Sequence, residues 1–72
     1  MLTQPDGFWS NVATLSCRER QSLWCVLFGY TNAEAAGRLG ISERTFEIHR
    51  QAMMRKMQTR TAAALVVLAW RA

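Results

Sequence analysis

The stretch that decides the fold runs from Thr31 to Met57 and reads TNAEAAGRLGISERTFEIHRQAMMRKM. Thr31 and Glu34, three residues apart, form a capping box that predicts a helix beginning, and Ser42 is a second capping residue. Gly40 lies between them and suits the positive φ of a tight turn. The stretch therefore predicts two helices, residues 31–39 and 42–57, joined by a short turn.

The spacing of small and large residues predicts how these two helices pack. Ala36 is small where the second helix would cross the first, and Phe46 would hold the second helix against the body of the domain. Ala35, Leu39 and Ile41 supply further apolar contacts. Two short helices with a glycine turn and this Ala-x3-Gly-x5-hydrophobe frame indicate a helix-turn-helix.

The longer helix, residues 42–57, has two unlike faces. Positions Phe46, His49 or Arg50, Met53 and Met57 recur at helical spacing and predict a buried stripe. The opposite face is mostly polar and would present its first turns to a DNA major groove. Its members are Arg44, Glu47, Ile48, Gln51, Met54 and Arg55.

Two more helices flank this pair in the sequence. Ser16 begins one that ends at Gly29, and Thr61 begins the last one, AAALVVLAW. Residues 1–14 hold a Pro-Asp-Gly turn signal and are predicted to be an irregular arm. The sequence thus predicts an all-α chain, with residues 15–72 forming a four-helix helix-turn-helix domain.

Composition and charge narrow the class of partner. The chain has 72 residues and a net charge of +4, and the whole excess lies between Arg38 and Arg60. A localised basic surface favours a polyanion such as double-stranded DNA, although a merely solvated basic face stays an alternative.

Cysteine spacing and hydropathy bear on the compartment. Cys17 and Cys25 lie on one predicted helix about 12 Å apart, too far for a disulfide, which fits a reducing cytoplasm. The sequence shows neither a membrane-spanning stretch nor a signal peptide. The expected localisation is therefore cytoplasmic, without membrane contact.

The motifs of enzymes and metal sites are not found in the sequence. It contains no carboxylate dyad, nucleophile–base pair or phosphate-binding loop, and no Cys/His cluster with metal-ligand spacing. We therefore expect no enzyme activity, no catalytic residue, no metal and no cofactor.

From about Leu15 to Ala69 the chain resembles the LuxR/GerE-type DNA-binding domain, in particular the FixJ/NarL response-regulator effectors. The similar segments are LSCRE, GYTNAEAA, LGISERTFEIH and KM, in the family's order. The resemblance implies that helix 42–57 reads DNA and that the last helix dimerises. It implies base contacts by Glu47, Ile48 and Gln51. It implies phosphate contacts by Thr31, Asn32, Arg44, Thr45, Arg50 and Lys56, and the basic helix adds Arg55.

Some positions depart from the family's pattern. Phe46 replaces the usual valine, and Ala35 replaces an isoleucine and could make room for the ring. Gln58 and Thr59 replace Gly-Val, and Ser22 replaces a core aliphatic residue. Only about fourteen residues precede the first expected helix, so the sequence predicts a free-standing effector without a sensor domain.

Apolar residues on two helices suggest protein contacts. Ala63, Val67 and Trp70 share one face of the last helix and predict a homodimer, whereas Leu65, Val66 and Ala69 are expected to turn inward. The alternative is a monomer with a partly exposed last helix. Trp24 and Phe28 are either covered by Phe8 and Trp9 of the arm or exposed to a protein partner.

The leading hypothesis is a sequence-specific transcription regulator of bacterial or phage type, acting as a homodimer on a pseudo-palindromic operator. The alternative is a small interaction module that antagonises a larger regulator through protein contact. A third hypothesis is a module like region 4 of sigma factors.

The sequence leaves two possible roles open for each of two glutamates, Glu47 and Glu19. Glu47 either selects bases and repels phosphates or pairs with Arg44 or Arg50. Glu19 either caps its helix or also pairs with Lys56.

Overall fold

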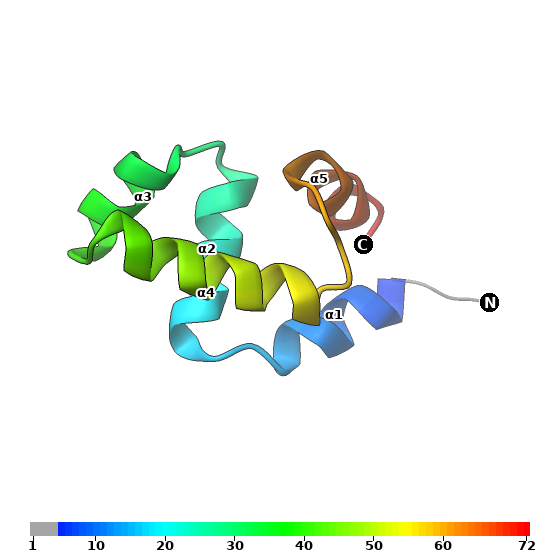
Figure 1. The fold of residues 1–72 in the computed structure, drawn as a ribbon. Helices are drawn as coiled ribbons and strands as arrows, with labels where there is room; N and C mark the ends of the chain where they lie inside the picture. The colour runs from blue at the N-terminus through cyan, green and yellow to red at the C-terminus, as the bar shows by residue number, and fades with distance from the viewer. Residues whose placement is uncertain (1–4) are drawn as a thin grey trace.

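The computed structural model describes residues 5–72, and within them every regular element is a helix. The helices are α1 (Pro5–Ala13), α2 (Cys17–Leu27), α3 (Asn32–Leu39), α4 (Glu43–Lys56) and α5 (Ala62–Arg71). Figure 1 shows α4 crossing in front of α2, with α3 at one end of the molecule and α1 and α5 at the other. The expected all-α class is confirmed, and the four expected helices are α2 to α5.

The helix beginnings follow the local capping signals. Ser16 and Thr31 each form a complete capping box with the glutamate three residues on. The hydroxyls of Ser42 and Thr61 each accept a backbone N–H at 3.0 Å. Gly40 ends α3 in the left-handed conformation, with φ of 70°. These signals hold because each depends on residues within one turn of the helix end.

The expectation of an irregular arm is wrong for Pro5–Ala13, which forms α1. Proline fixes φ at a helical value and lacks an N–H that the first turn does not need, so Pro-Asp-Gly is also compatible with a helix start. Phe8 of α1 is buried in the main core. The first four residues of the expected arm lie outside the described residues.

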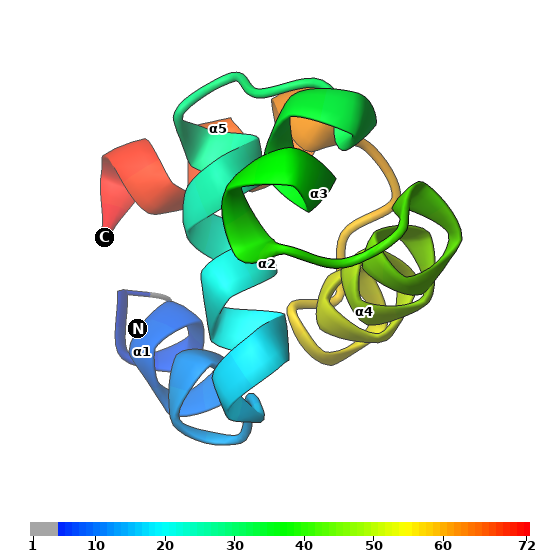
Figure 2. The ribbon, with the colours of Figure 1, turned by 90° about the vertical axis from the view of Figure 1, so that its left-hand side faces the viewer.

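The main core fills the space between α1, α2, α4 and α5. Its most deeply buried members are Leu23, Met53, Met57 and Leu65, each with at most 1% of its surface exposed. Figure 2, turned by 90°, shows α2 between α4 on one side and α1 and α5 on the other. The core therefore joins the last turns of α4 to α5 through α2.

A second, smaller core lies between α2, α3 and α4 and positions the helix-turn-helix. Phe46 has 1% of its surface exposed and packs with Cys25, Ala35 and Ala36. Ala35 itself has no exposed surface. The aromatic ring thus sits beside a small alanine, which agrees with the expectation that Ala35 makes room for it.

A buried serine and an ion pair complete the contacts of α2. Ser22 has no exposed surface, and its hydroxyl donates to the Arg18 carbonyl at 3.0 Å. The carboxylate of Glu19 accepts from the Ser16 backbone N–H at 2.8 Å and from Lys56 Nζ at 2.7 Å. Glu19 therefore caps α2 and also ties it to the end of α4, so both readings of this residue hold together.

This double role makes Glu19 a source of acid sensitivity. The hydrogen bond from Lys56, followed by the one from the Ser16 backbone, lowers the pKa of Glu19 from its usual 4.5. A lowered carboxyl pKa contributes stability above pH 4.5 that is lost as the pH falls through the lowered value. We expect Glu19→Gln to remove about 1 kcal/mol of unfolding free energy at neutral pH, and to flatten the acid branch of a urea-denaturation series.

Glu34→Gln is the matched control for this prediction. Glu34 forms the same capping box at α3 but is an exposed side chain without a lysine partner in the described residues. Glutamine preserves a capping box, so the two variants differ chiefly in the Lys56 ion pair. An equal loss at neutral pH in both variants would show that the ion pair contributes nothing.

Candidate nucleic-acid interface

The turn between α3 and α4 is fixed by backbone hydrogen bonds. The Ile41 N–H donates to the Ala36 carbonyl at 3.0 Å, and Gly40 adopts its left-handed conformation between them. The Ser42 hydroxyl then accepts from the Thr45 N–H and begins α4. Because Phe46 follows within one turn and is buried, the direction of α4 is set from its first residues.

Helix α4 has one buried and one exposed face. Phe46, Met53 and Met57 are buried, as predicted for the stripe, whereas His49 and Arg50, the candidates for its fourth position, are only half-buried. On the other side, Ile48 keeps 51% of its surface exposed and Gln51 is exposed. The sequence predicted that Met54 lies on the exposed face, but it has only 6% exposed surface and accepts a weak hydrogen bond from Thr59 Oγ1 at 3.6 Å. Met54 thus belongs to the main core, in the same cluster as Leu23 and Val26 of α2.

The three residues expected to contact bases lie on this outer side of α4. Glu47 is half-buried between the exposed Arg44 and Ile48. Arg44 Nη1 is 3.7 Å from Glu47 Oε1, and the two side chains are 76% and 40% exposed. An ion pair this long and this solvated contributes little to stability, so the Glu47 carboxylate remains accessible to another donor.

The residues expected to contact phosphates lie on two helices. Thr31 and Asn32 stand at the start of α3 and the others on α4. Arg55 is exposed and Arg50 is half-buried, so both guanidinium groups can extend outward. Lys56 differs, because its ammonium is already bonded to Glu19 at 2.7 Å and lies 3.4 Å from the Thr14 carbonyl. A phosphate contact by Lys56 would have to share this ion pair.

Helix α5 turns a broad apolar face to solvent. Val67 is 49% exposed and Trp70 is 89% exposed, and Ala63 is also exposed, as expected for the candidate dimer face. Leu65 is buried as predicted, but Val66 is 43% exposed and not turned inward. Helix α5 packs against the core through the side that carries Leu65. Val66 is one position further around the helix and therefore belongs to the outer face.

Trp24 and Phe28 are not covered by the N-terminal segment. They are 44% and 69% exposed, and their rings stack with centroids 6.3 Å apart. Phe8 instead enters the main core, and Trp9 stays 53% exposed beside it. The reading in which Phe8 and Trp9 bury this pair is therefore wrong, and an exposed aromatic patch remains.

Two exposed cations near the interface received no role from the sequence. Arg38 of α3 places its guanidinium carbon 4.4 Å from the Tyr30 ring centroid, and Arg60 is exposed just before the Thr61 cap. Arg38 and Arg60 both belong to the basic segment of the sequence, and this position could have marked them as candidate DNA contacts. Among residues 5–72 there is no group of three or more metal-ligating side chains, and no helix combines the length and apolarity needed to cross a bilayer.

A short helix, a glycine turn and a second helix with a basic outer face define a helix-turn-helix domain of the kind that binds DNA. Residues 13–69 match the family described as bacterial regulatory proteins of the luxR type, also called GerE. The chain belongs to this family, which consists of DNA-binding transcription regulators and not of enzymes.

Relatives of this chain in the family include response regulators. The chain is 46% identical over 56 residues to the response regulator TodT of Pseudomonas putida, covering 78% of this chain and 25% of TodT. It is 43% identical over 63 residues to the transcriptional regulator FixJ of Bradyrhizobium diazoefficiens, covering 88% of this chain and 31% of FixJ. The chain thus spans about a quarter to a third of the length of these relatives.

Solved structures show the same fold. Full-length FixJ from B. japonicum superposes with a TM-score of 0.85 at 39% identity, over 93% of this chain and 33% of FixJ. The response regulator StyR superposes with a TM-score of 0.85 at 36% identity, over 93% of this chain and 34% of StyR.

Proposed function

We propose that this domain binds double-stranded DNA sequence-specifically as a homodimer, in the cytoplasm, and thereby regulates transcription. In this proposal the first turns of α4 enter the major groove, and Glu47, Ile48 and Gln51 contact base edges. The observation that carries the proposal is the exposed polar face of α4. On the opposite face of the same helix, the buried residues of the stripe have at most 1% of their surface exposed. Such a helix is held rigidly while its outer side stays free for a partner.

The charges around α4 support a DNA partner over a neutral one. The segment from Arg38 to Arg60 carries six Arg and Lys residues against Glu43 and Glu47. Of the six cations, one, Lys56, makes a short ion pair within the domain and one, Arg44, a long and solvated one. The remaining guanidinium groups are available to neutralise phosphates, which supply most of the affinity in protein–DNA complexes.

Homodimerisation would place two copies of α4 in successive major grooves. Half-sites related by a two-fold axis would then be about 34–36 Å apart, one turn of DNA. Selection from randomised duplexes with the purified protein tests the proposal. A symmetric motif with two half-sites is expected, whereas recovery of sequences without any motif would contradict sequence-specific binding.

Arg50→Ala tests the proposed phosphate contacts. We expect affinity to fall similarly for operator and unrelated duplexes, and the slope of log affinity against log salt to decrease by about one. Fluorescence anisotropy over a salt series measures both quantities. Gln51→Ala is the comparison variant, with a loss confined to the preferred sequence and an unchanged slope. If Arg50→Ala shows that sequence-selective pattern, its phosphate role is wrong.

Glu47→Ala tests how a carboxylate functions inside a basic surface. A carboxylate can accept from cytosine N4–H and repels nearby phosphates, so its loss should relax preference at one base pair per half-site. It should also strengthen binding to unrelated DNA. Selection from randomised duplexes and anisotropy measure the two effects.

Glu43→Ala is the matched control, because it removes the same charge from the same helix at an exposed position outside the base-facing set. It should strengthen non-specific binding without changing any base preference. If Glu47→Ala behaves in the same way as Glu43→Ala, Glu47 only orients Arg44.

The exposed aromatic patch favours a second candidate function, antagonism of a larger regulator through protein contact. Trp24 and Phe28 are large, stacked and exposed at the C-terminal end of α2. This function predicts weak DNA binding by the domain alone. Strong, motif-specific binding in the randomised-duplex selection would reject it.

A further inference from the structure

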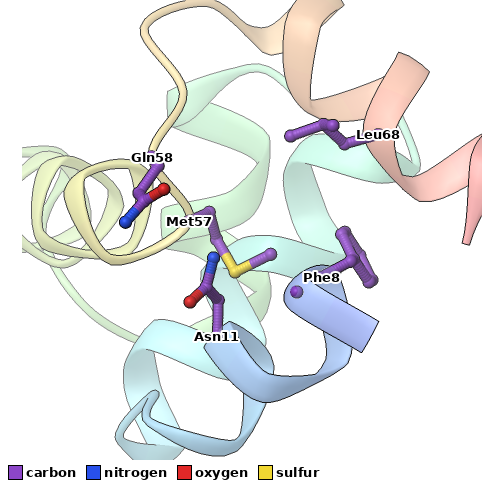
Figure 3. A pocket seen from close by; sticks show the side chains of 6 residues that line it. Phe8, Asn11, Met57, Gln58 and Leu68 are labelled. Carbon is purple, nitrogen blue, oxygen red and sulfur yellow. The ribbon is translucent and has the colours of Figure 1, made fainter. Parts of the chain in front are cut away.

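A pocket of about 330 Å³ lies where α1, the end of α4 and α5 meet. Figure 3 shows the Phe8 ring and the Leu68 side chain on one side of it, the carboxamides of Asn11 and Gln58 on the other, and the Met57 thioether between them. This pocket is separate from the outer face of α4, because Met57 belongs to the buried stripe of that helix. The proposed DNA contacts therefore leave it unused.

The walls of the pocket define the chemistry of a ligand. Phe8 and Met57 are 7% and 1% exposed, so the apolar wall belongs to the packed core and is already in place. Among the described residues that line the pocket, none carries a charge. A charged ligand would lose part of its hydration there without gaining a counter-charge from these residues. The pocket is thus suited to an uncharged molecule with an apolar body.

The polar end of the pocket adds directional hydrogen bonding. The side chains of Asn11 and Gln58 have no hydrogen-bond partner among the described residues. Each carboxamide offers two N–H donors and one carbonyl acceptor. A single amide, hydroxyl or carbonyl group of a ligand could therefore bond to both side chains while its apolar body contacts Phe8 and Leu68.

The backbone of Gln58 places its side chain at the pocket. Its φ is +59°, and Gln58 is the one residue other than glycine with positive φ among residues 5–72. This conformation costs a side-chain-bearing residue free energy that glycine would not lose. The end of α4 explains this conformation: the Gln58 N–H donates to the Arg55 carbonyl and the Thr59 N–H to the Met54 carbonyl, both at 3.0 Å, which is the Schellman pattern of a helix end. This helix end brings the Gln58 carboxamide to the pocket.

The geometry points to a ligand site in this pocket for a small uncharged molecule with an apolar body and one amide, hydroxyl or carbonyl group. Its volume lies at the lower end of the range for ligand pockets, about 300–1,000 Å³, so the ligand would be small. A ligand of this size in an open pocket binds with a Kd on the order of 1 mM. Because α4 and α5 both contribute walls, occupancy would also change DNA affinity, a consequence that rests on the proposed function.

Phenylacetamide is a suitable probe, because it combines one ring with one uncharged amide. In a titration followed by ¹H–¹⁵N correlation spectra of the whole chain without DNA, we expect saturable shifts of the Asn11 and Gln58 side-chain NH₂ signals. Phenylacetate has the same shape but a negative charge, and it should bind at least about tenfold more weakly. Equal binding of the two molecules would overturn the assignment of an uncharged ligand.

Gly7→Leu is the blocking variant. Gly7 lines the pocket, and a Cβ built there meets no atom within 4 Å, so a leucine can enter the open space without disturbing the fold. Gly37→Leu is the matched control, since Gly37 of α3 is equally open and lies outside the pocket. Loss of phenylacetamide binding in Gly7→Leu alone supports the site, and binding retained in Gly7→Leu overturns it.

Two further outcomes would also overturn the site. One is the lack of any saturable shift with phenylacetamide. The other is a shift of the Asn11 and Gln58 side-chain signals on protein dilution without probe, which would mean that a second copy of the chain fills the pocket. Both are measured without DNA, so they are independent of whether the domain binds an operator.

Discussion

Phe46→Ala is expected to leave much of the domain unfolded. Truncation of a fully buried phenylalanine costs about 3–5 kcal/mol, and a domain of this size has a total stability of only about 4–11 kcal/mol. Phe46 has 1% exposed surface and is the largest side chain of the second core. Thermal and urea denaturation followed by circular dichroism would measure the loss, and DNA binding should fall with it because α4 loses its anchor.

Phe28→Ala is the control for this variant. It deletes the same side chain at a position that is 69% exposed, where substitutions usually change stability by less than about 0.5 kcal/mol. Equal losses in the two variants would mean that the second core does not hold the helix-turn-helix together.

A milder pair of variants tests the fit between Phe46 and Ala35. Ala35 has no exposed surface and packs in the same core as the ring. Ala35→Ile alone should overpack the site and cost about 1–3 kcal/mol, and Phe46→Val alone should leave a cavity. The double variant should be more stable than the sum of the two losses indicates, because each change compensates for the other. Simple additivity would show that the two side chains do not share one space.

Val67→Asp should weaken operator binding by at least about a hundredfold. The proposed dimer buries the outer face of α5, and a buried carboxylate without a partner is costly. Joining two half-site contacts in one dimer typically raises affinity by about 10²–10⁴, and this gain disappears when the dimer dissociates. Analytical ultracentrifugation with and without DNA and gel shifts on the full operator measure the effect.

Two controls separate dimer loss from other damage. Ala64→Asp puts the same charge on the same helix at an exposed position in the first turn of α5. An acidic side chain near a helix N-terminus is favourable. Affinity for an isolated half-site should be unchanged in Val67→Asp, since α4 is untouched. If full-operator affinity and mass in the complex also stay unchanged, the domain does not dimerise through this face.

The capping residues explain why so much of the fold could be predicted. Ser16, Thr31, Ser42 and Thr61 each begin a helix as expected, and Gly40 forms the left-handed turn. All of these contacts join atoms within three to five residues of one another, so neighbouring residues in the sequence specify them. The buried stripe of α4 followed for the same reason, because helical periodicity alone places Phe46, Met53 and Met57 on one side.

The sequence predicted which residues form the candidate site, but not which side chains these residues contact. The sequence placed Glu47, Ile48 and Gln51 on the outer side of α4, where the structure also has them. It left open whether Glu47 pairs with Arg44, and the structure shows a long, solvated contact. It assigned Lys56 to a phosphate, whereas its ammonium is bonded to Glu19, 37 residues away in the chain. Contacts over such separations depend on how helices cross.

The sequence by itself determined four helices, the glycine turn, the basic outer face of α4 and membership of a regulator family. The tertiary structure alone decided that Pro5–Ala13 is helical and docks through Phe8, that Met54 is core, and that Val66 is exposed. The physical reason is that a helix end is set by hydrogen bonds within one turn, whereas burial at the margin of a helix face depends on the angle and distance of its neighbours. The pocket beside Gln58 likewise depends on how the helices pack, since its walls come from three helices.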